Sequence, residues 1–172
     1  MPNCSKLLIT GGSGFLGWNL AKYAAELYDV FFTYGQHFIT IEGCQEYQLN
    51  LQNRAEIENL LEEIRPEIMI HTAALANVDI CEKRRSVAHE INVAATTHLA
   101  TCAEELKCRF VYISTDLVFD GQTGHYTETA RPAPLNYYAE TKRLGEKAVM
   151  STMTDYLIVR MALMYGLGNG VN

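Results

Sequence analysis

The sequence lacks an excess of positive charge. Its 172 residues include 14 lysines and arginines against 20 aspartates and glutamates, so the net charge at pH 7 is −6. A phosphate backbone or an anionic membrane attracts a protein through a basic surface field, which this composition does not provide. We therefore expect neither nucleic acid nor a membrane among the partners of this chain.

Long apolar runs are also missing, since none approaches the about 20 residues that a membrane-spanning helix requires. The five cysteines (4, 44, 81, 102 and 108) form no CxxC pair, and an odd, scattered set is typical of reduced intracellular thiols. The five histidines have no metal-ligand spacing, so we expect no metal site. Together with the lack of a secretory pattern at the N-terminus, these features predict a cytoplasmic protein.

What the sequence does contain is a regular alternation of two kinds of segment. Short apolar runs predict strands at 6–10, 30–34, 67–71, 109–114 and 156–161, with a weaker strand at 46–49. Helical patterns occupy 15–28, 53–65, about 82–107 and 137–150. Asn53 is placed to cap the second helix and Pro66 to end it. This rhythm predicts an α/β fold, a Rossmann-like doubly wound parallel sheet with helices on both faces, in one domain over residues 1–172.

A glycine-rich turn follows the first predicted strand and opens the first predicted helix. Gly11 permits the sharp turn, Gly14 lets a pyrophosphate approach the backbone, and Gly17 lets the helix pack close to the sheet. The helix N-terminus offers free N–H groups and a partial positive charge to the same phosphates. Glycines also mark ordinary turns, but the strand–turn–helix context favours a dinucleotide site formed by Gly11, Gly14, Phe15, Leu16 and Gly17.

Two adjacent tyrosines precede a lysine at the start of the last predicted helix. At about 100° per residue, Tyr138 and Lys142 share one helix face, whereas Tyr137 and Lys142 diverge by about 140°. A phenol with its ordinary pKa of about 10 is a poor acid-base catalyst at neutral pH, and an ammonium about 4 Å away lowers that pKa by up to about three units. We thus expect Lys142 to lower the pKa of Tyr138 while Tyr137 packs or lines the pocket. The alternative is a plain surface Tyr–Lys pair.

Three motifs together resemble the extended short-chain dehydrogenase/reductase superfamily: the glycine turn, ISTDLVFDG at 113–121, and the Tyr138-x-x-x-Lys142 pattern. The residues at 72–82, 91–96, 114–121 and 130–146 are similar to one branch, the dTDP-4-dehydrorhamnose reductases of the RmlD type. The resemblance extends from Lys6 to about Gly168.

This resemblance implies roles for three side chains. Tyr138 would be the general acid that protonates a carbonyl oxygen, and Lys142 would lower its pKa and bind the nicotinamide ribose. Thr115 would hold the substrate oxygen, because a hydroxyl both donates and accepts hydrogen bonds. Thr115 has an alternative role as a turn residue at the strand end, and Asp116 has one as a cap of that turn.

The resemblance also implies contacts that follow the fourth strand. Ala73, Ala74 and Leu75 would face the cofactor through backbone atoms, and Asn92 matches the family's asparagine in the next helix. Asn92 has an equal alternative as a helix N-cap. Arg160 would lie near the substrate, with a capping or surface role as the alternative.

The choice of cofactor is read at the end of the second strand, where an acidic residue would bond the ribose 2′-hydroxyl of NAD. The chain has Tyr34 to His37 there, with neither an acid nor an arginine. This favours NADPH, with NADH as an alternative. Near the third strand, Asn50 and Leu51 replace the family's acid beside the adenine, and both are candidates for adenine contact.

The resemblance therefore implies an NADPH-dependent oxidoreductase that reduces a 4-keto sugar nucleotide, with a homodimer as the expected assembly. Two alternatives are an NAD-dependent sugar-nucleotide epimerase or dehydratase and a non-catalytic, dinucleotide-binding regulatory subunit. Family members continue into a smaller C-terminal substrate lobe, which we expect to be largely absent here after residue 165. The chain then has the residues for the chemistry but little of the substrate pocket.

Overall fold

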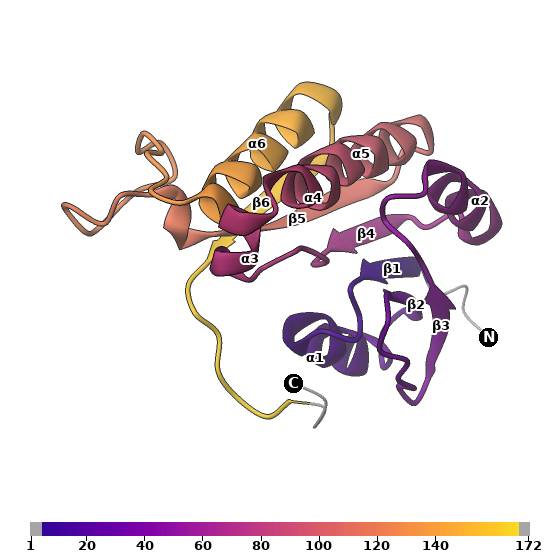
Figure 1. The fold of residues 1–172 in the computed structure, drawn as a ribbon. Coiled ribbons are helices and arrows are strands. Elements are labelled where there is room, and N and C mark those ends of the chain that lie inside the picture. The colour runs from indigo at the N-terminus through magenta and orange to yellow at the C-terminus, as the bar shows by residue number, and fades with distance from the viewer. Residues whose placement is uncertain (1–4, 169–172) are drawn as a thin grey trace.

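The computed structural model describes residues 5–168 and contains one parallel sheet with the strand order β3-β2-β1-β4-β5-β6 (Figure 1). The strands are β1 (Lys6–Thr10), β2 (Asp29–Tyr34), β3 (Cys44–Gln48), β4 (Ile68–His71), β5 (Arg109–Thr115) and β6 (Tyr156–Met161). The helices are α1 (Phe15–Ala24), α2 (Arg54–Ile64), α3 (Val78–Lys83), α4 (Arg85–His89), α5 (Ala95–Glu105) and α6 (Tyr137–Thr152). A π-helical segment, η1 (Glu90–Ala94), joins α4 to α5, and a 3-10 turn, η2 (Asp116–Val118), follows β5. The predicted α/β fold is confirmed.

The direction of sheet growth reverses at β1. After β1 the chain builds outwards through β2 and β3, and it then crosses to the other side of β1 to add β4, β5 and β6. Leu8 in β1 is therefore opposite Phe31 of β2 on one side and Met69 of β4 on the other. The carboxyl ends of β1 and β4 flank this switch point, which is where open α/β sheets bind their ligands.

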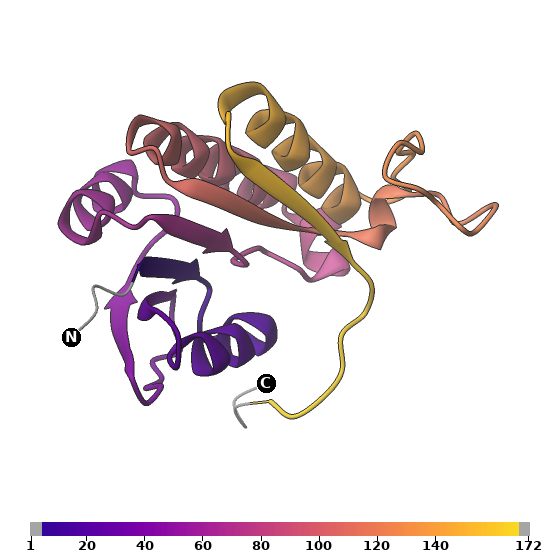
Figure 2. The same ribbon diagram turned by 180° about the vertical axis from the view of Figure 1, so that it is seen from behind.

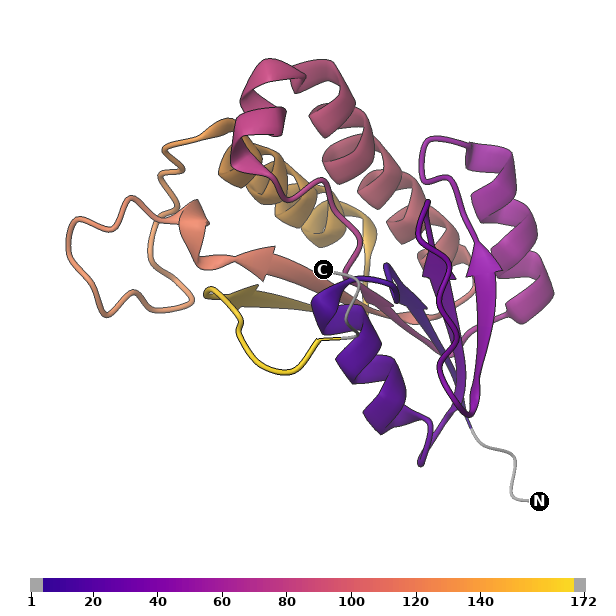
Figure 3. The same cartoon turned by 60° about the horizontal axis from the view of Figure 1, so that its bottom comes forward.

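The two faces of the sheet are covered unequally. The helices α2, α5 and α6 lie on one face, and α1 is the only helix of residues 5–168 on the other (Figures 2 and 3). The larger core, with Leu99 and Phe110, lies under the first group, and the smaller core, with Ile9 and Phe32, lies under α1. Because α1 packs over β1 and β2, it does not reach β6, where Leu157 is 55% exposed.

The ends of α2 follow the local signals in the sequence. The side chain of Asn53 accepts a hydrogen bond of 3.4 Å from the backbone N–H of Glu56, so it caps the helix as predicted. Arg65 adopts the left-handed conformation (φ 49°) and ends the helix directly before Pro66. Both ends of this helix are therefore set by residues within one turn of them.

The single helix predicted at about 82–107 is wrong. Arg84 leaves helical geometry (φ −127°, ψ 56°), which separates α3 from α4, and the π-helical η1 then interrupts the path from α4 to α5. The first helix is also shorter than predicted and ends at Ala24. No proline or glycine stands at 82–107 to announce these breaks, so the pattern alone does not reveal them.

Four of the five cysteines lie within the described residues. Cys44, Cys81, Cys102 and Cys108 are free thiols, while Cys4 lies outside the described residues. Within residues 5–168, no three His, Cys, Asp or Glu side chains are grouped to hold a metal ion. The same part of the chain has no helix long and apolar enough to cross a membrane.

Candidate functional site

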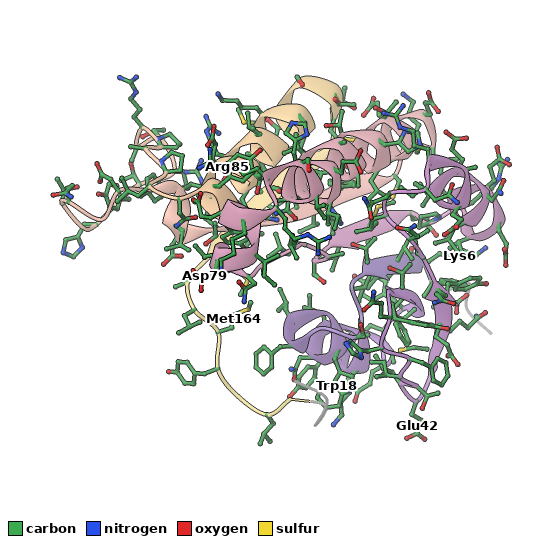
Figure 4. All side chains as sticks on the ribbon, viewed as in Figure 1. Lys6, Trp18, Glu42, Asp79, Arg85 and Met164 are labelled. Atoms are coloured by element: carbon green, nitrogen blue, oxygen red, sulfur yellow. The ribbon has the colours of Figure 1, made fainter. Side chains whose placement is uncertain are left out.

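A pocket of about 870 Å³ lies at the carboxyl ends of the strands, beside α1. This volume is within the range of ligand pockets, about 300–1,000 Å³. Its wall combines the glycine turn, the end of β2, the loop after β4, the end of β5, the start of α6 and the segment after β6. Met164 of that last segment lies between α3, which carries Asp79, and α1, which carries Trp18 (Figure 4). The pocket thus occupies the switch point of the sheet.

A second, smaller pocket of about 450 Å³ lies at the opposite end of the strands. Its wall is polar and includes Lys107 and the ion-paired side chains of Arg109 and Asp155. Parallel sheets bind their ligands at the carboxyl ends of the strands, so we assign no site to this amino-terminal end.

The three predicted glycines meet different spatial demands. Gly11 has a positive φ of 76°, and a Cβ atom there would lie 2.8 Å from the backbone of Ala73. A Cβ atom on Gly17 would overlap the carbonyl oxygen of Gly11, so this glycine lets α1 pack against the turn. At Gly14, the N-cap of α1, a Cβ atom would meet only the Gly11 oxygen, at 3.3 Å. Gly11 and Gly17 thus shape the turn, whereas Gly14 lines the pocket and has the Gly11 oxygen as the one close neighbour of its Cβ position.

Gly12 is a further glycine of this turn whose role the sequence reasoning missed. A Cβ atom at this position would overlap the ring of Phe32 in β2. The Gly12 backbone N–H also donates to the carbonyl oxygen of Thr33 at 2.7 Å. The Gly-Gly pair directly after the first strand was the available signal, because such a pair indicates close packing of the backbone.

The loop after β4 is held in place by Asn92. Ala73, Ala74 and Leu75 line the pocket. The side chain of Asn92 accepts from the Leu75 N–H at 2.8 Å and donates to the Leu75 oxygen at 3.1 Å and to Oγ1 of Thr141 at 3.0 Å. Asn92 is buried within η1, so its alternative role as an N-cap is wrong, and it does not line the pocket itself. It ties the loop to α6 instead.

The start of α6 separates the two tyrosines. The side chain of Asn136 caps the helix by accepting from the backbone N–H of Ala139 at 2.8 Å. Tyr138 and Lys142 then both line the pocket. Tyr137 is not among the pocket's lining residues, and the guanidinium of Arg85 lies 4.7 Å from its ring centroid. The structure thus places Tyr137 in packing and Tyr138 in the site.

The electrostatics of this pair differ from the prediction. Burial lowers the pKa of Lys142 to about 7, although the nearby Glu146 carboxylate opposes this shift. Burial raises the pKa of Tyr138, and the Cys81 thiol and the Asp116 carboxylate raise it further. The expectation that Lys142 lowers the pKa of Tyr138 is therefore wrong for this structure. A lysine with a pKa of about 7 is already neutral at the pH where this phenol titrates, so it has no charge with which to lower the phenol's pKa.

The hydroxyl of Thr115 serves two purposes at the end of β5. Its Oγ1 donates to Oδ1 of Asp116 at 3.2 Å and accepts from the backbone N–H of Leu117 at 3.2 Å, so it caps η2. Thr115, Asp116 and Leu117 also line the pocket. The turn role is thus present, and Thr115 lines the same pocket as Tyr138.

The adenine end of the predicted site is only partly as expected. Tyr34, Gly35 and Leu51 line the pocket. The side-chain oxygen of Asn50 instead accepts from the backbone N–H of Gln52 at 3.1 Å, and Asn50 is not among the lining residues. Ser13, Thr33 and Leu49 line the pocket although the sequence reasoning did not select them.

A buried ionic cluster behind the site was also missed. The carboxylate of Glu146 is fully buried and accepts hydrogen bonds from Ser114 at 2.7 Å, from Arg143 at 2.8 Å and from two nitrogens of Arg160 at 2.8 Å each. Burial opposes ionisation, but these donors hold the pKa of Glu146 below its usual value. Arg160 therefore joins β6 to α6, and it is not among the residues that line the pocket.

Comparisons with known proteins agree with this geometry. The family model described as "RmlD substrate binding domain" matches residues 5–172. Methionine adenosyltransferase 2 subunit beta of Mus musculus is 35% identical over 161 residues, which are 94% of this chain and 47% of that protein. The dTDP-4-dehydrorhamnose reductase of Burkholderia thailandensis is 33% identical over 156 residues, which are 90% and 49% of the two chains.

A solved structure shows the same arrangement of elements. The dTDP-4-dehydrorhamnose reductase of Bacillus anthracis, crystallised in complex with NADP, superposes with a TM-score of 0.84 and 34% sequence identity. The match covers 96% of this chain and 56% of that one. The chain thus spans about half the length of the relatives that it matches.

Proposed function

Because the chain belongs to the RmlD substrate binding domain family, we propose that its pocket binds NADP(H) and that Tyr138 serves in the reduction of a 4-keto sugar nucleotide. One observation carries this proposal. The wall of a single pocket contains both the glycine turn and the side chains of Tyr138, Lys142 and Thr115. This arrangement supports the proposal that cofactor binding and proton transfer take place in one pocket.

The residues of the pocket fit a dinucleotide. No side chain caps the N-terminus of α1 at Gly14, and the first N–H groups of a helix have no partner within the helix, which suits a pyrophosphate. Gly35, at the end of β2, has open space around its Cβ position, and no acid stands there to repel a 2′-phosphate. We therefore favour NADPH over NADH, in keeping with the NADP bound to the Bacillus anthracis reductase.

In the proposed reaction, bound NADPH supplies a hydride to the carbonyl carbon. Tyr138 donates its proton to the carbonyl oxygen, and its raised pKa keeps it in the protonated form that a general acid needs. Thr115 would hold that oxygen through its hydroxyl and Lys142 would bind the nicotinamide ribose, since both residues line the pocket. The sugar-nucleotide substrate, such as dTDP-4-dehydrorhamnose, follows from the family rather than from any residue of this pocket.

A non-catalytic regulatory role is the second candidate. The observation in its favour is the 35% identity to methionine adenosyltransferase 2 subunit beta, a protein named as a subunit rather than as a reductase. Both candidates predict NADP(H) binding in the same pocket. They differ in whether Tyr138 has any effect on a reaction.

Kinetics of Tyr138→Phe separate the two candidates. We expect the chain alone to bind NADPH, and a chimera that continues into the second half of the Burkholderia thailandensis reductase to oxidise NADPH with dTDP-4-dehydrorhamnose. In that chimera Tyr138→Phe should lower kcat by about 10² to 10⁴ with little change in NADPH affinity. The matched control, Tyr137→Phe, should cost far less. Equal losses in the two variants, or none in Tyr138→Phe, would remove the catalytic proposal, and a chimera that binds NADPH without turnover would favour the regulatory role.

A further inference from the structure

The ammonium of Lys142 lies against the face of an aromatic ring. Its Nζ atom is 4.1 Å from the ring centroid of Tyr112, and the two side chains come from α6 and β5. Tyr112 is fully buried and Lys142 is 2% exposed. An ammonium within about 6 Å of a ring centroid is attracted by the negative face of the ring, and the attraction grows when water is excluded.

The ring of Tyr112 has little freedom to move away from the lysine. Its hydroxyl donates to the backbone oxygen of Lys142 at 3.4 Å. On the same helix, a Cβ atom at Gly145 would overlap that hydroxyl, so the glycine leaves only enough room for the ring. The ring of His71 lies 5.8 Å away on the neighbouring strand. The aromatic face is thus a fixed surface behind the pocket wall.

Among the charged and titratable groups around Lys142, Glu146 attracts its ammonium, in addition to the contact with the ring. Burial and the nearby lysine lower the pKa of His71 to about 3, so this imidazole is neutral at physiological pH. Glu146, one turn further along α6, attracts the ammonium, but its two oxygens accept from Ser114, Arg143 and Arg160. The phenol of Tyr138 stays protonated.

We propose that Tyr112 is a positioning residue whose ring face holds the Lys142 ammonium at the pocket wall, in the place from which it meets the cofactor. The role assigned to Lys142 rests on the proposed function. The contact between ring and ammonium does not, because it is present in the chain by itself.

Graded fluorination tests this role without changing the shape of the core. Position 112 is replaced by phenylalanine and then by mono-, di- and trifluorophenylalanine, which weaken the negative face of the ring stepwise. The pKa of Lys142 is followed by NMR of its Cε and Nζ signals, assigned by their loss in Lys142→Met, and NADPH affinity is measured by calorimetry. The same series at Phe110 is the matched control, since this buried residue of β5 has no cation over its ring within residues 5–168.

We expect the pKa of Lys142 to fall by about one unit from phenylalanine to trifluorophenylalanine at position 112, with NADPH affinity falling in step. The series at position 110 should leave both values unchanged. A flat pKa across the series at position 112 would overturn the proposal, and so would a rise, because a rise indicates that loosened packing has admitted water. If the pKa falls while Lys142→Met leaves NADPH affinity unchanged, the role of Tyr112 towards the cofactor is overturned together with the proposed function of Lys142.

Discussion

The two halves of the sheet build the pocket by different means. The half formed by β1, β2 and β3 contributes backbone and shape, through the glycine turn and an apolar core under α1. The half formed by β4, β5 and β6 carries a buried histidine, lysine and glutamate, His71, Lys142 and Glu146. The first half is therefore suited to hold a ligand, and the second is suited to move a proton near it.

This difference explains why the two halves were not equally predictable. The demands on Gly11 and Gly17 arise within the turn itself, so residue type and spacing reveal them. The electrostatics of the second half depend on partners far apart in the chain, such as Ser114 and Glu146. Burial, which spacing does not report, then decides the direction of the pKa shift at Tyr138.

The largest effect should come from removing the buried carboxylate of the second half. Glu146→Ala leaves Arg143 and Arg160 without their acceptor, and breaking a buried ion pair in this way costs about 3–5 kcal/mol of unfolding free energy. Glu146→Gln keeps the shape and should cost less. Because folding lowers the pKa of Glu146, the ionised carboxylate stabilises the folded state above the unfolded pKa of about 4.3. This stabilisation is lost as pH falls through the folded pKa.

Urea unfolding of both variants between pH 3 and pH 7 would measure this contribution. The difference in unfolding free energy between the wild-type protein and Glu146→Gln should shrink as the pH falls. A difference that stays constant across this range would show that the ionised carboxylate is not what stabilises the cluster.

A smaller effect of opposite sign is expected at Lys142. Its pKa is lowered to about 7, so holding the protonated lysine in the folded state is unfavourable at neutral pH and below. Lys142→Met should therefore raise the unfolding free energy by about 2–4 kcal/mol at pH 6. This gain should decline as pH rises from about 7 towards the unfolded pKa of about 10.4. Thermal unfolding at pH 6 and pH 9 measures this gain. A Lys142→Met variant that is less stable than the wild type at pH 6 would contradict the prediction.

The smallest effect concerns the choice of cofactor in the first half. Gly35 has nothing within 4 Å of its Cβ position, so Gly35→Asp should fold normally. The new carboxylate should repel a 2′-phosphate. The affinity for NADPH should therefore fall about tenfold, or 1.4 kcal/mol, further than the affinity for NADH. Gly35→Asn is the uncharged control. Calorimetry with both cofactors tests this, and a wild-type preference for NADH would refute the interpretation of β2.

The successes of sequence analysis follow from short-range signals. The alternating apolar runs gave the sheet and its helices, and Asn53 correctly marked the start of α2. The failures involve contacts over long sequence distances. Asn92 is recognised as a clamp only once Leu75 and Thr141 are placed beside it, and no local pattern announces η1. The homodimer and the cytoplasmic location stay predictions, because no contact in the chain bears on either.

Titration of NADPH into the wild-type protein and into Gly14→Val tests the central claim most directly. A valine fits the extended conformation of Gly14 (φ −78°, ψ 165°), and its Cβ atom has one tight contact, at 3.3 Å to the Gly11 oxygen, so the variant should fold with a small loss of thermal stability. Gly17→Val, whose Cβ atom overlaps the turn, is the control that should lose the fold instead. We predict that the wild type binds NADPH and that folded Gly14→Val does not, because the side chain occupies the place of the pyrophosphate. Unchanged NADPH affinity in a folded Gly14→Val variant would contradict the assignment of this pocket to a dinucleotide.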